Sequence, residues 1–292
     1  MTILGIQYAS NLFVSKCNSW KQAQKLLKVG ASKHLALLGN IGQPNSSKTK
    51  DFIRWCSDNW ENVYCVPGPL ELRQANSLYG LFSKIPVNVH LLDQQVLEVN
   101  SHFTLAGCPL WSAHAKVLKK QTKWNESERA LMAFKDPKEI EFFHNEDLEF
   151  LSQAIVNLET HAPYKNMIFL THHLPSQELI SSNSFMDISR QIILYDGAIE
   201  RFFEFQKLAG CLSGANSNSV TGFLGPHRTY CGVNPAFKND NLVPNPSYRP
   251  DAVAYFQHKK PPTKSQNNPS NFLASLKMYL PQPVLAIADP PK

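Results

Sequence analysis

The sequence has no long apolar run and no secretory leader pattern. None of its stretches reaches about 18 consecutive apolar residues, the length that indicates a membrane-spanning helix. The first residues, Met1 to Gly5, lack the basic and apolar regions of a signal peptide. We therefore expect a protein that is not secreted and that is kept in the cytoplasm.

Paired cysteine motifs and common catalytic signatures are also missing. The chain has no C-x-x-C pair, no Gly-rich phosphate loop, no G-x-S-x-G motif and no internal repeat. The cysteines are Cys17, Cys56, Cys65, Cys108, Cys211 and Cys231. Several of them lie within apolar runs, so we interpret them as reduced core residues and not as zinc ligands or disulfides.

The composition is that of a globular protein with a moderate basic excess. Hydrophobic residues make up 43% of the 292 residues and charged residues 18%, which excludes a chain disordered throughout. A net charge of +6 favours an acidic partner, a nucleic acid or an anionic membrane surface. Because the lysines are spread along the sequence, we interpret them first as a solvated surface.

Short apolar runs alternate with helical stretches in the first part of the chain. The runs are Ile3 to Tyr8, Leu35 to Leu38, Val63 to Val66, Phe103 to Ala106 and Met167 to Leu170. Helices are predicted from a cap at Ser19 through Leu27, from Thr49 to Trp60, from Leu72 to Lys84, and from a cap at Asn145 through Leu158. Connections of this length return the chain in parallel, which predicts an α/β arrangement.

The clearest of these helices is the last. Glu146 and Asp147 would occupy its first turn, where acidic side chains are favourable. An apolar stripe follows at helical spacing and is formed by Leu148, Leu151, Ile155 and Leu158. This stripe predicts a face that packs on a sheet.

The second half changes character and then ends in a different composition. Its strands are predicted at Cys211 to Ser213, Val220 to Leu224, His227 to Gly232 and Ala252 to Tyr255, joined by turns in a mostly antiparallel sheet. Residues 1–256 would form one domain, a two-sheet β-sandwich flanked by helices in four layers, α-β-β-α. Residues 257–292 are rich in Pro, Asn and Lys and predict a C-terminal extension with an apolar cluster that could dock on a partner, formed by Phe272, Leu273, Leu276, Met278, Tyr279 and Leu280.

Four short stretches that follow predicted strands carry a recognisable frame. They are Ser10-Asn11-Leu12-Phe13, Gly39-Asn40-Ile41-Gly42, Gly68-Pro69-Leu70-Glu71 and Gly214-Ala215-Asn216-Ser217. In these positions the chain resembles the calcineurin-like metallophosphoesterases, whose motifs read I-Q-Y-x-S-D-L-H, G-D-I-G, G-N-H-E and G-H-T-H. Leu110-Trp111-Ser112, Thr171 to Ser176 and Asn234-Pro235 match further motifs of the same branch, in the same order. The resemblance spans about Ile3 to Tyr255 and implies the metallophosphoesterase sandwich fold.

The same resemblance implies that nearly all metal ligands of the family are replaced here. The substituted positions are Asn11, Phe13, Asn40, Pro69, Leu70, Ala215 and Ser217, and only His172 keeps a ligand type. Two divalent ions about 4 Å apart repel by roughly 20 kcal/mol at an effective dielectric constant of 20, so such a pair needs carboxylates between them. Neutral asparagine amides cannot supply that charge, and a single imidazole does not hold a transition metal. We expect no metal, no cofactor and no catalytic residue at these positions.

These substitutions favour a pseudoenzyme. The leading hypothesis is a noncatalytic scaffold that binds other protein chains through its surface and its C-terminal extension, in a large assembly such as a viral capsid. One alternative is a metal-independent nucleotide or phosphate binder that uses His172, His173 and the asparagines, among them Asn216 and Asn218. A residual phosphoesterase and a nucleic-acid binder, the latter suggested by Lys259, Lys260 and Lys264, are further alternatives.

Overall fold

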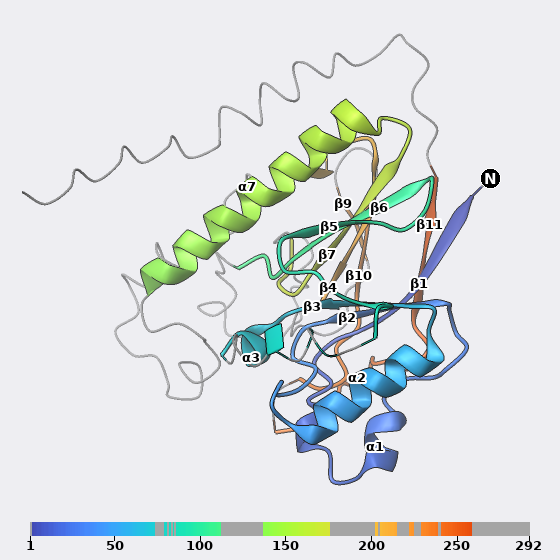
Figure 1. The fold of residues 1–292 in the computed structure, drawn as a ribbon, viewed down its shortest axis with the longest axis vertical. Coiled ribbons are helices and arrows are strands. Elements are labelled where there is room, and N and C mark those ends of the chain that lie inside the picture. The colour runs from blue at the N-terminus through green and yellow to red at the C-terminus, as the bar shows by residue number, and fades with distance from the viewer. Residues whose placement is uncertain are drawn as a thin grey trace, which may run out of the picture.

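A computed structural model of the chain describes residues 2–73, 79, 80, 82, 84, 86–111, 137–175, 202, 203, 205–214, 222–224, 229–238 and 241–258. Within these ranges the strands form two sheets, and helices cover their outer faces (Figure 1). The predicted two-sheet α/β sandwich is confirmed.

The first sheet has five strands in the order β11-β1-β2-β3-β4. Their bounds are β1 Ile3–Ala9, β2 His34–Leu38, β3 Asn62–Val66, β4 Val89–Leu91 and β11 Val253–Gln257. The strands β1 to β4 are parallel, and β11 pairs antiparallel with β1 at the edge. The outer face of this sheet is covered by the short helix η1 (Val14–Lys16), by α1 (Trp20–Gln24) and by α2 (Ser47–Asn59).

The second sheet has six described strands in the order β5-β6-β7-β8-β10-β9. Their bounds are β5 Gln95–Glu98, β6 Phe103–Cys108, β7 Asn166–Thr171, β8 Leu208–Ser213, β9 Gly222–Leu224 and β10 Thr229–Val233. The four central strands are parallel, and only β5 and β9 run antiparallel to their neighbours. The prediction of a mostly antiparallel second sheet was therefore wrong. All residues of β6 and β7 are buried, as is usual for parallel strands covered on both faces.

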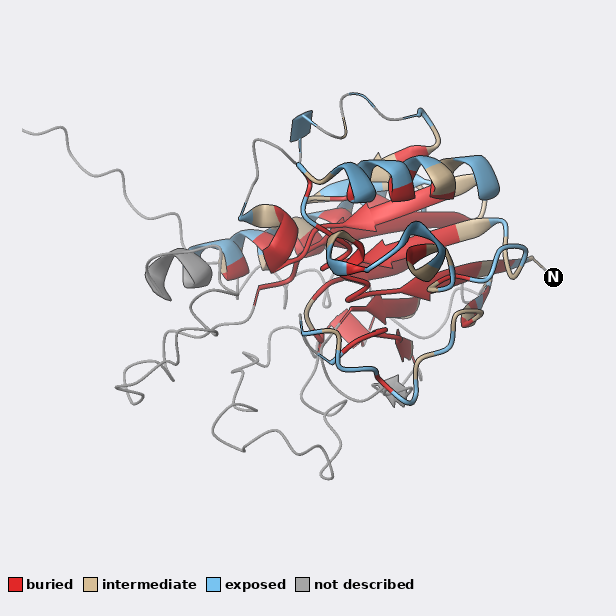
Figure 2. Cartoon of the chain, turned by 90° about the horizontal axis from the view of Figure 1, so that it is seen from below, coloured by how far each residue is buried: buried red, intermediate tan, exposed pale blue. Residues whose placement is uncertain are grey.

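Three apolar clusters fill the spaces between four layers. One lies between the first sheet and η1, α1 and α2, a second lies between the two sheets, and a third lies between the second sheet and α7 (Pro137–His161). Figure 2 shows that the strands are buried almost throughout, whereas the helices expose their outward faces. All six cysteines are buried and unbridged within this core.

The predicted helices are confirmed with corrected bounds. Ser19 is the N-cap of α1 and its side chain accepts a hydrogen bond from the backbone of Gln22. The helix α7 begins at Pro137, so Asn145 lies inside it and is not its N-cap, because a proline at the first helical position followed by good helix formers starts the helix two turns earlier. The predicted helix over 72–84 falls partly outside the described residues. In the described part, α3 covers Pro69–Leu72.

The described chain ends just after the edge strand. The strand β11 extends to Gln257, one residue past the predicted domain boundary, and the His258 amide donates to the Thr2 carbonyl at 3.0 Å. Residues 259–292, with Phe272, Leu273, Leu276 and Tyr279, lie outside the described part. No helix in the described part has the length and hydropathy that a membrane span requires.

Candidate functional site

The substituted positions come together at the carboxyl ends of the strands. Asn11 follows β1, Asn40 follows β2, Leu70 lies in the first turn of α3 after β3, and His172 follows β7. All four side chains are buried. The carboxyl edge of a parallel sheet is where α/β proteins place their ligands, so this region is the candidate site. Ala215, Asn216, Ser217 and Asn218 lie outside the described residues.

Two asparagine side chains face each other where the resemblance implies metal-bridging aspartates. The Asn40 Nδ2 donates to Asn11 Oδ1 at 3.0 Å. The Asn40 Oδ1 accepts a hydrogen bond from the backbone N–H of Leu70, also at 3.0 Å. Both ends of the Asn40 amide are therefore used within the protein, and the three loops after β1, β2 and β3 are joined by a neutral hydrogen-bond chain.

The backbone around this pair is held in a rare conformation. Asn11, Phe13 and Asn40 have positive φ values of 50°, 44° and 54°. The Asn11 amide donates to the Gly39 carbonyl at 2.9 Å, and the Phe13 amide donates to the Asn40 carbonyl at 3.0 Å. A left-handed backbone at a bulky residue such as Phe13 costs on the order of 1 to 3 kcal/mol and persists only where its surroundings fix it. Such residues are typical of functional loops, so the loop geometry of a site is present while its ligand types are not.

Glu71 joins these loops through backbone hydrogen bonds, a role that the sequence did not indicate. Its carboxylate accepts four backbone hydrogen bonds, from Gly68 at 2.8 Å, Asn40 at 2.9 Å, Ile41 at 2.7 Å and Gly42 at 3.1 Å. Burial raises the pKa of Glu71, and the four donors act in the opposite direction. Glu71 also caps α3, and it is 6% exposed.

His172 makes a hydrogen bond that fixes its ring. Its Nδ1 lies 2.7 Å from the carbonyl oxygen of Leu38, the last residue of β2. Burial lowers the pKa of His172 to about 4, so the imidazole is neutral at physiological pH. The neighbouring Gly39 has φ +82°, and a Cβ there would lie 2.2 Å from His172 Nδ1. The histidine thus occupies space that only glycine leaves open.

A second buried carboxylate lies near the same edge of the second sheet. Asp147, from α7, accepts hydrogen bonds from Gln94 Nε2 at 3.0 Å and from the Trp111 amide at 3.1 Å. Burial raises its pKa to about 7. The sequence predicted Asp147 in the first turn of its helix, which was wrong because α7 starts at Pro137, and Asp147 is buried within it.

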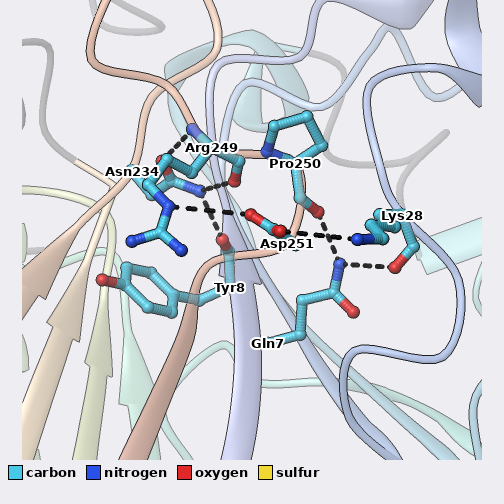
Figure 3. A network of polar contacts seen from close by, with 7 residues as sticks. All are labelled: Gln7, Tyr8, Lys28, Asn234, Arg249, Pro250 and Asp251. Atoms are coloured by element: carbon cyan, nitrogen blue, oxygen red, sulfur yellow. Dashed lines mark hydrogen bonds and ion pairs between the residues drawn. The ribbon is translucent and has the colours of Figure 1, made fainter.

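The Asn234-Pro235 motif has a structural role in this protein. Asn234 Nδ2 donates to the carbonyls of Tyr8 and Arg249, both at 2.9 Å, and Asn234 Oδ1 accepts from the Arg249 amide at 3.1 Å (Figure 3). In the same network Gln7 Nε2 donates to the Pro250 carbonyl at 2.7 Å. These bonds join the end of β1 to the segment that precedes β11.

A small cavity lies beside Glu71, and neither Asn11 nor Asn40 lines it. Its volume is about 20 Å³, and Thr49 and Phe82 also lie in its wall. A volume of this size has room for about one water molecule, whereas pockets for drug-sized ligands measure on the order of 300 to 1,000 Å³. This cavity does not accommodate a nucleotide.

The residues present do not fit the metal pair that the fold family implies. Asn11 and Asn40 are uncharged and bonded to each other, and the side chains of Phe13, Pro69 and Leu70 offer no donor atom to a metal. Among the described residues, no group of three or more His, Cys, Asp or Glu side chains has the arrangement of a metal site. In the described part of these loops, the donor groups are one imidazole, neutral amides and the Glu71 carboxylate, which already accepts four backbone hydrogen bonds. This set has too few anionic ligands to offset the repulsion of two divalent ions.

Comparisons with known proteins bear on the fold. No family model matches this chain, and a search of curated proteins finds no matching relative. The solved structure of the phosphopantetheinyl hydrolase PptH from Mycobacterium tuberculosis is similar with a TM-score of 0.58 and 10% sequence identity, over 79% of this chain and 88% of that chain. A second solved structure is similar with a TM-score of 0.52 and 11% identity, over 79% of this chain and 90% of that chain. This chain therefore shares the fold of this hydrolase, at an identity that shows the fold alone.

Proposed function

We propose that this protein is a noncatalytic interaction protein built on a metallophosphoesterase-like scaffold. The observation that carries the proposal is the closed amide chain from Asn11 through Asn40 to the Leu70 backbone. Each polar atom of the Asn40 side chain already has a protein partner, and the apolar Phe13 packs in the core beside it. Contacts within the protein stabilise these loops, whereas in a metal enzyme the corresponding side chains must contact the metal ions.

The proposal is supported by the chemical roles that a phosphoester hydrolase must fill, because the residues expected in those roles are unsuited to them here. A dimetal enzyme generates its nucleophile by lowering the pKa of a metal-bound water, which needs bound cations. It also needs a proton donor for the leaving group, and the position that the resemblance assigns to that donor is the apolar Leu70. A buried His172 with a pKa near 4 is unprotonated at neutral pH and so is a poor general acid there.

Other protein chains are the proposed partners. Support comes from a scaffold kept without the ligand types of its site and from the Pro-rich segment over 259–292 with its apolar cluster. A component of a large assembly, such as a virion shell, would use a fold in this way. The assembly role is tested separately from the loss of catalysis.

The first test is hydrolysis of p-nitrophenyl phosphate and bis-p-nitrophenyl phosphate with added Mn²⁺. The full chain should give no turnover above that of a His172→Ala variant prepared in the same way, since a trace contaminant acts equally in both samples. Turnover that depends on Mn²⁺ and disappears in the variant would overturn the noncatalytic half of the proposal.

The second test compares the full chain with a chain ending at His258. Both are tagged, expressed in the native host cell and purified, and recovered partners are quantified by mass spectrometry. Specific protein partners should be recovered with the full chain and lost from the shortened one, which should still unfold cooperatively. Equal recovery by both chains would contradict a docking role for the extension.

A further inference from the structure

The positive charge of this protein is concentrated in one segment. Residues 16–54 contain eight Lys or Arg residues and one Asp, a net charge of +7, so all other residues together carry −1 of the overall +6. The basic residues are Lys16, Lys21, Lys25, Lys28, Lys33, Lys48, Lys50 and Arg54, and each is exposed. Basic residues occur throughout the sequence, but in the rest of the chain acidic residues balance them.

The fold places the helices of this segment on one side of the molecule. The buried residues of η1, α1 and α2 share a single apolar cluster on the outer face of the first sheet (Figure 1). The Lys48 ammonium on α2 donates to the Cys17 carbonyl after η1 at 2.6 Å. The rings of Trp20 on α1 and Trp55 on α2 make an edge contact with centroids 6.3 Å apart. We call Lys16, Lys21, Lys25, Lys48 and Trp20 the basic helical face. Lys50 and Arg54 are not part of it, because at 3.6 residues per turn they lie on the other flank of α2 from Lys48.

Part of this charge is not neutralised by the protein. Lys28 pairs with Asp251 at 3.7 Å and Lys33 pairs with Glu61 at 2.6 Å, both beside the helices. Lys21 and Lys25 have no ion-pair partner among the described residues. Free ammonium groups held on one rigid side attract a polyanion and release its counterions on binding.

Trp20 adds an aromatic surface to this charge. Its side chain is 38% exposed, although tryptophan side chains are highly buried on average in folded proteins. One edge of the ring is supported by Trp55, which in turn contacts Trp60 at 5.6 Å, so the ring is held from behind. Unpaired bases stack on such rings without regard to sequence.

We propose that the basic helical face binds single-stranded nucleic acid, with lysines along the sugar-phosphate backbone and Trp20 as a stacking surface for a base. An anionic membrane is the less favoured partner, because Trp20 and Val29 are the only large apolar side chains strongly exposed among residues 16–60. The basic helical face contains none of the side chains of the asparagine loops. This inference therefore does not depend on the proposed loss of catalysis.

The test measures fluorescence anisotropy of a labelled 20-nucleotide oligo-dT with the full chain between 50 and 200 mM salt. The Lys16→Gln, Lys21→Gln, Lys25→Gln triple variant should bind more weakly, and its slope of log K against log salt should be shallower by about 2, at roughly 0.7 per phosphate contact on a single strand. The matched control replaces Lys259, Lys260 and Lys264 by Gln, removing the same charge from the C-terminal segment, and should keep the wild-type slope.

A second variant separates stacking from charge. Trp20→Ala should weaken binding to the single strand by about tenfold and leave binding to a 20-base-pair duplex nearly unchanged, and Trp20→Phe should restore part of the loss. Circular dichroism of each variant verifies the fold. No binding at 50 mM salt, a loss confined to the C-terminal control, or binding to phosphatidylserine vesicles without binding to the oligonucleotide would each overturn the proposal.

Discussion

Replacing Glu71 by Gln should destabilise the candidate site strongly, although the two side chains have nearly the same shape. The carboxylate accepts backbone hydrogen bonds from Gly68, Asn40, Ile41 and Gly42. A Gln side chain has one acceptor oxygen, which can take two of these donors, and its NH₂ group would face the other two. Each buried donor left unsatisfied costs about 1 to 3 kcal/mol, so the free energy of unfolding should fall by roughly 2 to 6 kcal/mol.

Urea unfolding followed by circular dichroism at pH 7.5 measures this loss. The matched control is Glu61→Gln, since Glu61 is exposed and its only described partner is the surface residue Lys33 at 2.6 Å. Surface ion pairs contribute little, so the control should unfold close to the wild type. A Glu71→Gln variant as stable as the control would show that the four hydrogen bonds do not hold the loops in place, and would refute the description of this site.

Three further variants test the burial of single groups. Asp147→Asn should remove a contribution to stability that is present near pH 4 and lost as pH rises to about 7, because the folded protein keeps a proton on Asp147 that the unfolded chain has lost. The stability of the variant relative to the wild type should therefore rise across this window, and parallel urea profiles for both proteins would contradict it. His172→Gln should have the opposite effect between about pH 6.5 and 4, where the unfolded imidazole takes up a proton that the buried one does not, so its stability relative to the wild type should rise on acidification, and an unchanged difference in urea titrations would count against it. Gly39→Ala should lower the unfolding midpoint more than Gly30→Ala, because both glycines have positive φ but only Gly39 would direct a Cβ into His172, whereas Gly30 has open space; equal losses would exclude that contact.

The strands were the most predictable part of the fold. The runs at Ile3, Leu35, Val63, Phe103 and Met167 all lie in strands, because apolar residues bounded by polar turns favour buried β structure whatever their neighbours are. Which strands pair could not be read from the runs themselves. The order β6-β7-β8-β10 depends on connections that cross the sheet, and the short strands of the second half resembled a hairpin pattern.

The sequence predicted which residue types meet at the site, but not the buried carboxylates that hold the surrounding backbone in place. The positions of Asn11 and Asn40 followed from the family frame, and both side chains do meet. The role of Glu71 could not be predicted, because its four partners are backbone amides, which carry no residue signature in the sequence. Asp147 was misassigned because the first turn of its helix lies earlier than the cap pattern at Asn145 indicated.

The charge of the protein gives a similar lesson. Lys21, Lys25 and Lys28 follow a helical spacing, but nothing in the sequence places them on the same side of the molecule as Lys48 on another helix. They are grouped because η1, α1 and α2 all bury their apolar sides in one cluster and so expose the remaining sides in common. Surface patches of this kind depend on tertiary packing and become visible only once the helices are placed.

Metal content tests the central claim most directly. The protein is purified without chelator and analysed by elemental mass spectrometry for Zn, Mn, Fe and Mg, with protein concentration determined on the same sample. Because the asparagine pair supplies no anionic bridge, the account predicts transition metal well below one ion per chain. Two bound metal ions per chain would contradict it and would show that the loops after β1, β2 and β3 hold an enzyme site.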